Sequence, residues 1–275
     1  MKLNEFYSLL NEVAPKALSD RFCEGTGIYD NSGVLVDTGK EIEKVLFSLD
    51  LTFAAIEEAK QQGASLIVTH HPAIYGKISS VRYGAVDPLG KKLISCIESG
   101  ISVIAMHLNL DIAKGGIDES LRDGIRLAAQ KKTGAGLSLN EDVAVFEKVD
   151  GGGYGRVYDL PKITLNDLVE GIKEEFGLTR LAVYGDGEKT IERAASFCGS
   201  GGDLDSVAFA FEKGAEVVVS SDFKHHVLLL AKELGVAVIA PTHYASENYG
   251  FKKYYEKIRR QAEVACVYHT DGDLL

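Results

Sequence analysis

The chain has 275 residues, of which 45% are apolar and 25% charged, as in globular proteins and unlike disordered, collagen-like or coiled-coil chains. This length allows one large or two small domains with a buried core. The net charge of −10 disfavours general binding to nucleic acids, because phosphate backbones repel an acidic protein.

No uninterrupted apolar run reaches about 18 residues, so we expect no membrane span. Residues 1–18 are typical of an amphipathic helix and not of a signal peptide. The four cysteines are far apart, which excludes a CxxC zinc or redox motif. We therefore expect a reduced, cytoplasmic protein.

Helical and strand patterns alternate along the first half. Strand-like runs occur at residues 46–49, 66–69 and 103–105, and helical patterns lie between them at 54–59 and 90–99. This order predicts an α/β fold with largely parallel strands.

The alternation continues in the second half. Residues 143–146 are a strand candidate, 151–156 are turn-rich, and 164–175 form a helical pattern with Thr164 as its N-cap. Residues 134–136 (Gly-Ala-Gly) read as a linker between the halves.

Two segments recur in the same order. Residues 63–69 resemble residues 214–220, and a His-His pair follows each of them. Residues 100–105 resemble residues 235–240, and a single histidine follows each of these. The pattern indicates two related α/β halves.

We therefore predict an α/β fold made of two related halves with mostly parallel sheets. The first half covers residues 1–130 and is joined by the C-terminal segment 245–275, and the second covers residues 131–244. Ligands often bind at the carboxyl ends of parallel strands, where most of the histidines fall.

Two of the histidines precede a carboxylate at a spacing of four: His107 with Asp111, and His243 with Glu247. In a helix, or a turn that opens one, this spacing puts both side chains on one face. His70 and His71 end a strand before Pro72, where the chain can turn so that both rings are usable.

Imidazole and carboxylate groups without thiolates suit zinc, iron or manganese. A single open catalytic site needs about three protein ligands. Five candidate ligands are too many for one such site, and they predict two divalent ions about 3.5–4 Å apart. The candidates are His70, His71, Asp111, His243 and Glu247.

Several linked motifs cover nearly the whole chain. They lie at residues 29–33, 49–52, 66–72, 107–116, 198–202, 222–226 and 242–247. With them the sequence resembles the NGG-interacting-factor-three-like family, whose members are also called GTP cyclohydrolase 1 type 2 homologs.

The resemblance implies a two-domain α/β subunit with a dinuclear metal centre between the domains. It also implies ring-shaped homohexamers whose metal sites face an inner cavity. The family's ligands map onto the same five residues, and His107 maps to a cavity residue or to a partner of the ligands. Two motifs depart from the family pattern: Ser220-Ser221-Asp222 stands in place of Thr-Gly-Asp, and Thr242 replaces a glycine before the late His-Tyr.

Lesser features have open alternatives. The Gly199–Asp203 segment reads as a tight βα turn or as an anion cradle. His225 and His226 either line a cavity or cap a strand, and Asp222 is expected to fix a histidine tautomer. His269 is expected to be a surface residue. The basic cluster at residues 252–260 is expected to be a solvated helix face.

The leading interpretation is a metal-dependent hydrolase that acts on a phosphate ester or nucleotide-like small molecule through a metal-activated water. His107 is the candidate proton shuttle, because imidazole titrates near neutral pH. One alternative is a metal storage or delivery protein without turnover, and another is a ring-shaped scaffold. Nothing in the residues specifies guanine.

Overall fold

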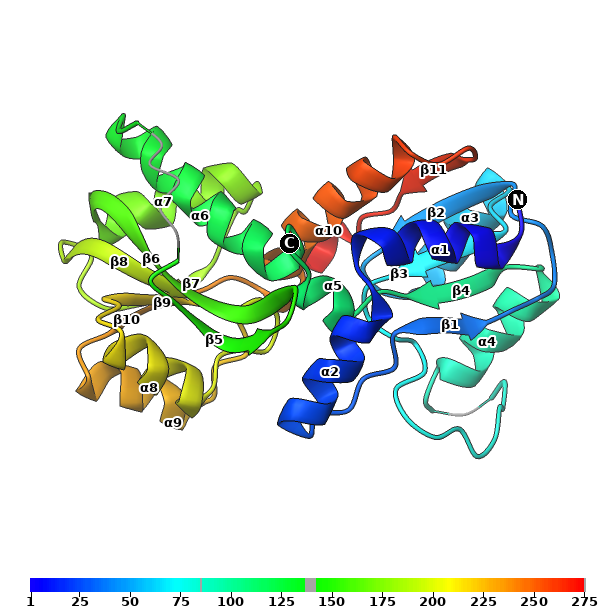
Figure 1. The fold of residues 1–275 in the computed structure, drawn as a ribbon, viewed down its shortest axis with the longest axis horizontal. Coiled ribbons are helices and arrows are strands. Elements are labelled where there is room, and N and C mark those ends of the chain that lie inside the picture. The colour runs from blue at the N-terminus through cyan, green and yellow to red at the C-terminus, as the bar shows by residue number, and fades with distance from the viewer. Residues whose placement is uncertain (85, 137–141, 275) are drawn as a thin grey trace. The chain divides into compact units, whose positions relative to one another are not determined.

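The computed structural model describes residues 1–84, 86–136 and 142–274. The chain divides into two compact units, which are described separately (Figure 1). The first unit contains residues 1–113 and 251–271, and the second contains residues 114–250 and 272–275. Helix α10 (His243–Arg259) begins in the second unit, and its residues from Phe251 onwards belong to the first.

The first unit contains five strands and five further helices in its described part. They are α1 (Leu3–Val13), α2 (Lys16–Thr26), β1 (Gly33–Val36), β2 (Lys44–Ser48), α3 (Phe53–Gln62), β3 (Leu66–Thr69), α4 (Leu89–Glu98), β4 (Ser102–Ala105), α5 (Leu108–Ile112) and β11 (Ala265–Tyr268).

The strands of the first unit form a sheet in the order β1-β4-β3-β2-β11. Strands β2, β3 and β4 are parallel neighbours, β11 adds in parallel to β2, and β1 adds antiparallel to β4. Helices α3 and α4 make the two crossovers, so the carboxyl ends of β2, β3 and β4 meet at one edge of the sheet.

Alternation along these strands divides the core between two faces. Leu46, Ile67 and Val103 are aligned across the sheet and pack with α3 and α4. Phe47 lies on the opposite face, where its ring packs against Phe251 and two tyrosines of α10. The central strands are buried on both sides, which explains their continuous apolar runs.

The described part of the second unit contains six strands and a short 3-10 helix, Gly272–Leu274. Its other elements before α10 are α6 (Ile117–Thr133), β5 (Ala144–Val149), β6 (Gly152–Thr164), α7 (Leu165–Phe176), β7 (Ala182–Tyr184), β8 (Thr190–Ser196), α8 (Leu204–Glu212), β9 (Val217–Val219), α9 (His225–Glu233) and β10 (Ala237–Ala240).

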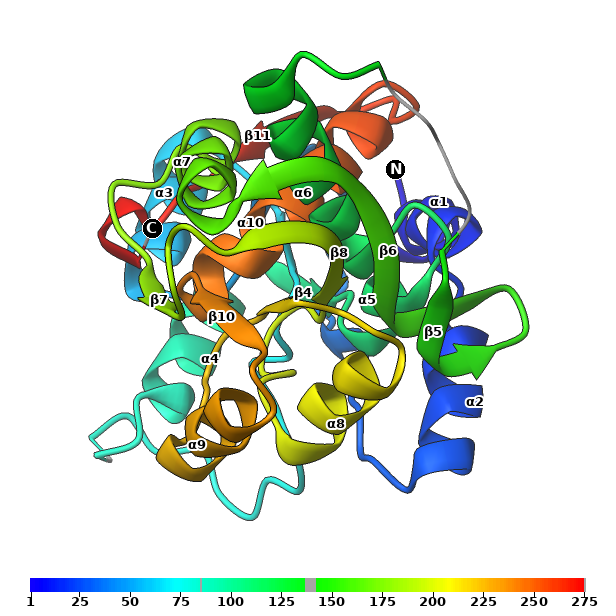
Figure 2. The same ribbon diagram turned by 90° about the vertical axis from the view of Figure 1, so that its left-hand side faces the viewer.

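The second sheet has the order β5-β6-β8-β9-β10-β7 and is mixed. Strands β8, β9 and β10 are parallel neighbours, whereas the described pairings of β5 with β6, β6 with β8, and β10 with β7 are antiparallel. The expectation of mostly parallel sheets thus holds for the first unit and only for the centre of the second. Figure 2 shows α8 and α9 on one side of these strands and α6 and α7 on the other.

The antiparallel hairpin explains one misread segment. Residues 151–156 were expected to be a turn, but β6 begins at Gly152 and pairs with β5 through this glycine-rich run. A Cβ at Gly153 would lie 2.7 Å from the Val145 side chain, so close strand packing requires glycine there.

The predicted repeat is present as a shared strand–helix order. In each unit a helix is followed by a glycine with positive φ, Gly63 or Gly214, and then by a buried strand. The next helix and strand repeat this arrangement around Gly100 and Gly235. Both units therefore contain a βαβαβ core of the same connectivity.

The observed division differs from the predicted boundary at residue 130. Helix α6 starts at Ile117 and packs on α7 and β6, so residues 114–130 lie in the second unit. Gly134 is the left-handed C-cap of α6 and does not mark the division.

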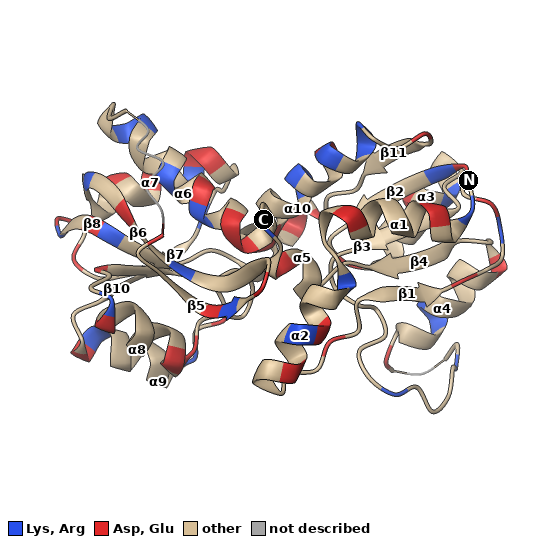
Figure 3. Ribbon diagram, viewed as in Figure 1, with Lys and Arg blue, Asp and Glu red and all other residues tan. Residues whose placement is uncertain are grey.

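Helix α10 has the expected solvated basic face. Lys252, Lys253, Lys257, Arg259 and Arg260 are exposed, while the aromatic and aliphatic residues between them are buried. In Figure 3 the blue segments along the ribbon of α10 mark its basic residues. No helix in the described part of the chain is long and apolar enough to cross a membrane.

Candidate functional site

His70 and His71 follow β3 at the carboxyl edge of the first sheet. Both of their backbone amides donate to the carbonyl oxygen of Leu49, at 3.1 and 3.0 Å, which ends the strand and turns the chain. The two rings lie side by side, with centroids 4.8 Å apart. The turn expected before Pro72 therefore brings two adjacent imidazoles together.

The His70 ring is fully buried and its tautomer is fixed by its partner. Its Nδ1 lies 2.7 Å from the carbonyl oxygen of Met106, which can only accept, so Nδ1 carries the proton. The lone pair of Nε2 then faces Asp111, whose Oδ1 lies 3.4 Å away. Asp111 is in α5 and is itself buried.

His71 and His107 are each held at Nδ1 by a carboxylate. His71 Nδ1 lies 2.8 Å from Asp50 Oδ1, and His107 Nδ1 lies 2.8 Å from Asp30 Oδ1. Burial alone raises the pKa of Asp30, but hydrogen bonds from His107 and Ser32 outweigh it and hold that pKa well below its ordinary value. Asp30 is therefore an ionised acceptor at neutral pH.

The three histidines form one cluster within the first unit. One ring nitrogen from each of His70, His71 and His107 lies within 4.8 Å of the others. The Asp111 amide donates to the carbonyl oxygen of His107, so the residue before α5 and the carboxylate within it are held together. Three imidazoles with their Nδ1 atoms occupied, plus a buried carboxylate, form a donor set that can bind a divalent cation.

A second group of donors lies in the second unit, at the start of α10. His243 Nε2 is 3.1 Å from Glu247 Oε1, as the spacing of four predicted. His243 Nδ1 lies 2.6 Å from Asp222 Oδ2, so this imidazole is also held by a carboxylate, as expected for Asp222. Among the residues that the structure describes, Asp222 is the one non-glycine residue with a positive φ, 59°. Aspartate tolerates this strained conformation better than most residues do.

The Gly199 loop closes over the second group. A Cβ at Gly199 would lie 2.2 Å from Glu247 Oε1 and 3.3 Å from His243 Nε2, and its φ of +59° favours glycine. The Gly199 amide donates to Ser246 Oγ, and the Gly201 and Gly202 positions also have no room for a side chain. These contacts favour a closely packed βα turn over an anion cradle.

A buried carboxylate supports this loop. Asp118 accepts hydrogen bonds from the amides of Gly155 and Cys198 and from Arg156 Nε. Its complete burial raises its pKa to about 6, against the lowering effect of the Arg156 charge. This pair of Asp118 and Arg156 was not predicted, because both residues also fit an exposed helix or strand face.

The remaining histidines lie outside the two groups. His225 and His226 are exposed at the start of α9, so neither caps a strand. The expectation that His269 is a surface residue is wrong, because its side chain is only 11% exposed and lies between Glu58 and Asp271. Burial lowers the pKa of His269, but these two carboxylates outweigh it and the pKa is raised overall.

The carboxylates that hold the first group were not predicted from the sequence. Asp30 and Asp50 lie 77 and 21 residues from the histidines that they contact. Each lies within a recognised motif, at residues 29–33 and 49–52, next to a strand end. Their position in a motif beside a strand end is the feature of the sequence that could have indicated them.

Comparison with known proteins finds several relatives that share one name. A protein from Clostridium perfringens named GTP cyclohydrolase 1 type 2 homolog is 32% identical over 265 residues, covering 96% of this chain and 93% of its own. One of the same name from Methanocaldococcus jannaschii is 31% identical over 272 residues, covering 97% and 98%.

Solved structures share the fold. The structure of reduced HcgD from Methanocaldococcus jannaschii matches with a TM-score of 0.76 and 27% identity, over 98% of this chain and 97% of that one. A Bacillus cereus protein related to NIF3 matches with a TM-score of 0.77 and 21% identity, over 97% and 96%. The model of the Duf34/NIF3 (NGG1p interacting factor 3) family matches residues 1–271. The chain therefore belongs to the Duf34/NIF3 family.

Proposed function

We propose that the chain binds two divalent metal ions, of zinc, iron or manganese, and acts as a metal-dependent hydrolase on a phosphate ester or nucleotide-like substrate. The proposed ligands are His70, His71, Asp111, His243 and Glu247. One observation carries the proposal: each ligand histidine has its Nδ1 atom on a carbonyl or carboxylate oxygen, so that Nε2 is the ligating nitrogen. This arrangement is usual for metal-binding histidines.

The residues fit such ions by their chemistry. Imidazole nitrogens and carboxylate oxygens are ligands that zinc, iron and manganese accept. Three of the proposed ligands, His70, Asp111 and Glu247, are buried. When bound, the ions would lower the pKa of water and stabilise negative charge on the substrate.

The protein's own residues then have distinct tasks. Asp50 and Asp222 orient His71 and His243 through Nδ1. His107, held by the ionised Asp30, presents Nε2 as the atom that takes up or releases a proton. If the His107→Ala variant kept its turnover and pH profile on an active substrate, this assignment to His107 would be wrong.

Metal content per chain tests the proposal. The protein is purified without chelators, reconstituted with zinc, iron or manganese, and measured by elemental analysis. We expect two equivalents in the wild type, fewer in His243→Ala, and two in His226→Ala, the matched control with an exposed histidine outside both groups. Little metal in the reconstituted wild type would exclude the two-metal mechanism.

The name of the curated relatives suggests GTP as one substrate to test. Purine ring opening needs an activated water, which is compatible with the proposed chemistry. Incubation of the metal-loaded protein with GTP should release formate if this is the reaction. Without formate or a new pterin, GTP ring opening is excluded while hydrolysis of other phosphate esters stays open to screening.

A second candidate function is metal storage or delivery without turnover. The observation in its favour is His107, a third imidazole within the cluster beyond the proposed ligands. A carrier passes its ions to an apo acceptor protein, whereas a catalyst retains them through turnover. Metal exchange measured with a chromogenic acceptor separates the two.

We also propose that the chain assembles as a homohexamer, on the basis of the family resemblance. Sedimentation velocity should then show a species of about six chain masses. A monomer or dimer at micromolar concentration would contradict this assembly.

A further inference from the structure

Two exposed tyrosines lie against each other beside the first histidine cluster. Tyr29 is 53% exposed and Tyr75 is 58% exposed. They come from different loops, one before β1 and one after β3, yet their rings meet edge to face, with centroids 5.5 Å apart at 88°. Large aromatic side chains that stay exposed as a contacting pair are candidates for binding.

Hydrogen bonds hold this pair in place. The Tyr75 hydroxyl donates to the carbonyl oxygen of Tyr29 at 2.8 Å, and Asn31 Nδ2 donates to the carbonyl oxygen of Ile74 at 2.6 Å. These two hydrogen bonds therefore join the loop before β1 to the loop after β3. A ring fixed in this way loses little conformational freedom when a ligand binds to it.

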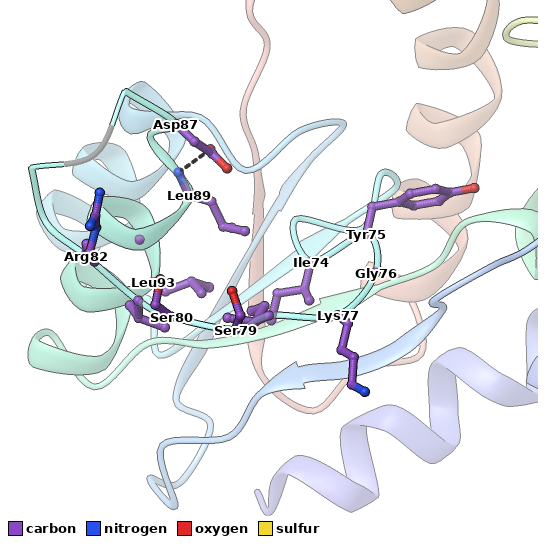
Figure 4. Close-up of a pocket in the computed structure, with 13 residues that line it drawn as sticks. Ile74, Tyr75, Gly76, Lys77, Ser79, Ser80, Arg82, Asp87, Leu89 and Leu93 are labelled. Carbon is purple, nitrogen blue, oxygen red and sulfur yellow. Dashed lines mark hydrogen bonds between the residues drawn. The ribbon is translucent and has the colours of Figure 1, made fainter.

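The pair is next to the proposed chemistry. The Tyr75 ring lies edge-on to the His107 ring, with centroids 6.3 Å apart at 88°. A cavity of about 380 Å³ is lined by residues that follow β3, Tyr75 among them, and by the start of α4. In the close-up of Figure 4 the Tyr75 side chain points away from Leu89 and Leu93. Tyr75 thus lines that cavity, and its ring also borders the histidine cluster at His107.

An exposed tyrosine ring is suited to one class of ligand group. Planar heteroaromatic rings stack on tyrosine whatever their hydrogen-bonding pattern, because every such ring has a π face. A phosphate ester at the proposed metal centre would need a second contact to fix its non-reacting part. Tyr29 and Tyr75 are positioned to supply that contact beside His107.

We propose that Tyr29 and Tyr75 form a ring-binding subsite for the planar heteroaromatic group of a phosphorylated substrate. This inference rests on the proposed function, since the phosphate end is assigned to the metal ligands. It extends that function by naming the residues that select nucleotide-like substrates over simple phosphate esters.

Calorimetric titration of the metal-loaded protein tests the subsite without turnover. The probes are the monophosphates of guanosine, adenosine and uridine, with ribose 5-phosphate as the ringless probe. The variants are Tyr75→Leu, which removes the aromatic ring, and Tyr75→Phe, which keeps it. Tyr184→Leu is the control, an exposed tyrosine on β7 of the second unit.

We expect at least one nucleotide to bind more tightly than ribose 5-phosphate. Tyr75→Leu should lower the affinity for that nucleotide about tenfold, which corresponds to the loss of one stacking contact. Tyr75→Phe keeps the ring but loses the hydrogen bond to Tyr29, so it should weaken nucleotide binding less than Tyr75→Leu does. Tyr184→Leu should retain the affinity, and ribose 5-phosphate should bind all variants equally. Melting curves of the variants check that each one folds.

Two results would overturn the subsite. One is a metal-loaded wild type that binds no nucleotide better than ribose 5-phosphate. The other is a Tyr75→Leu variant that keeps its nucleotide affinity. If that variant also changes the sedimentation coefficient, the tyrosine pair packs against a second copy of the chain and not against a ligand. Metal content is measured on the same samples, so failure to bind metal is recognised separately as failure of the proposed function.

Discussion

Replacing Gly199 by alanine tests the packing of the second group. The new Cβ would lie 2.2 Å from Glu247 Oε1, so this oxygen must move by at least about 1 Å to regain ordinary contact. Metal–ligand distances are kept within about 0.2 Å, so a displaced carboxylate is a poor ligand. We expect Gly199→Ala to weaken metal binding at least about tenfold.

Gly177→Ala is the matched control. Gly177 ends α7 with a φ of +69°, close to the +59° of Gly199, and nothing lies within 4 Å of its Cβ position. Both substitutions should cost about 1 kcal/mol of backbone free energy, because alanine disfavours the left-handed region. Only Gly199→Ala adds a collision with a proposed ligand.

Two measurements on each variant separate these effects. Denaturant unfolding of the metal-free protein gives the stability loss, and titration against a chelator gives the metal affinity. Equal metal affinities for Gly199→Ala and Gly177→Ala would refute the reasoning, since Glu247 would then bind metal from a position that does not depend on this contact.

Three further predictions concern the charged groups. Asp222→Gly removes the acceptor at His243 Nδ1 while allowing the positive φ, so metal affinity should fall about 10–100-fold in a chelator competition. The raised pKa of His269 means that the folded chain binds this proton more tightly than the unfolded chain does. Its stabilising effect is therefore complete below about pH 6.5 and is lost as the pH rises through the folded pKa, and His269→Asn should flatten that slope in unfolding measured from pH 6 to 9. Asp118→Ala should destabilise by about 3 kcal/mol, because it leaves buried donors unpaired. Asp159→Ala, which breaks an exposed pair, should cost less than about 1 kcal/mol, and equal losses for the two would contradict this.

The sequence predicts most reliably what local patterns determine. The run at residues 66–69 is β3, and the helix from Thr164 begins where its cap predicts, with the Thr164 hydroxyl accepting from the Asp167 amide. The spacing of His243 and Glu247 gives their contact, because both lie in the first turns of one helix. These features depend on neighbours within a few residues.

Features that depend on residues distant in the sequence were harder to predict. The same spacing of four in His107 and Asp111 does not produce the same pairing, since Asp111 lies against His70 and His107 is held by Asp30. His107 is the N-cap of α5 with a φ of −100° and a ψ of −112°, outside the helical region, so the rule for one helix face fails there. The order of the strands in the sheet determines which carboxylate contacts each imidazole ring.

The repeated βαβαβ core explains why the sequence pattern predicted where the polar residues lie but not the role of each one. Equivalent strand ends carry polar residues in both units, so the repeat marks where the chemistry lies. After β3 the first unit has His71, a proposed ligand, whereas the equivalent position after β9 holds Asp222, which orients a ligand. After β2 the first unit has Asp50 as the orienting carboxylate, while the second has the Cys198–Gly199 turn after β8. The shared backbone thus fixes the positions, but the residue at each strand end determines whether the group is a proposed ligand or a carboxylate that orients one. Only the hydrogen bonds in each unit distinguish the two.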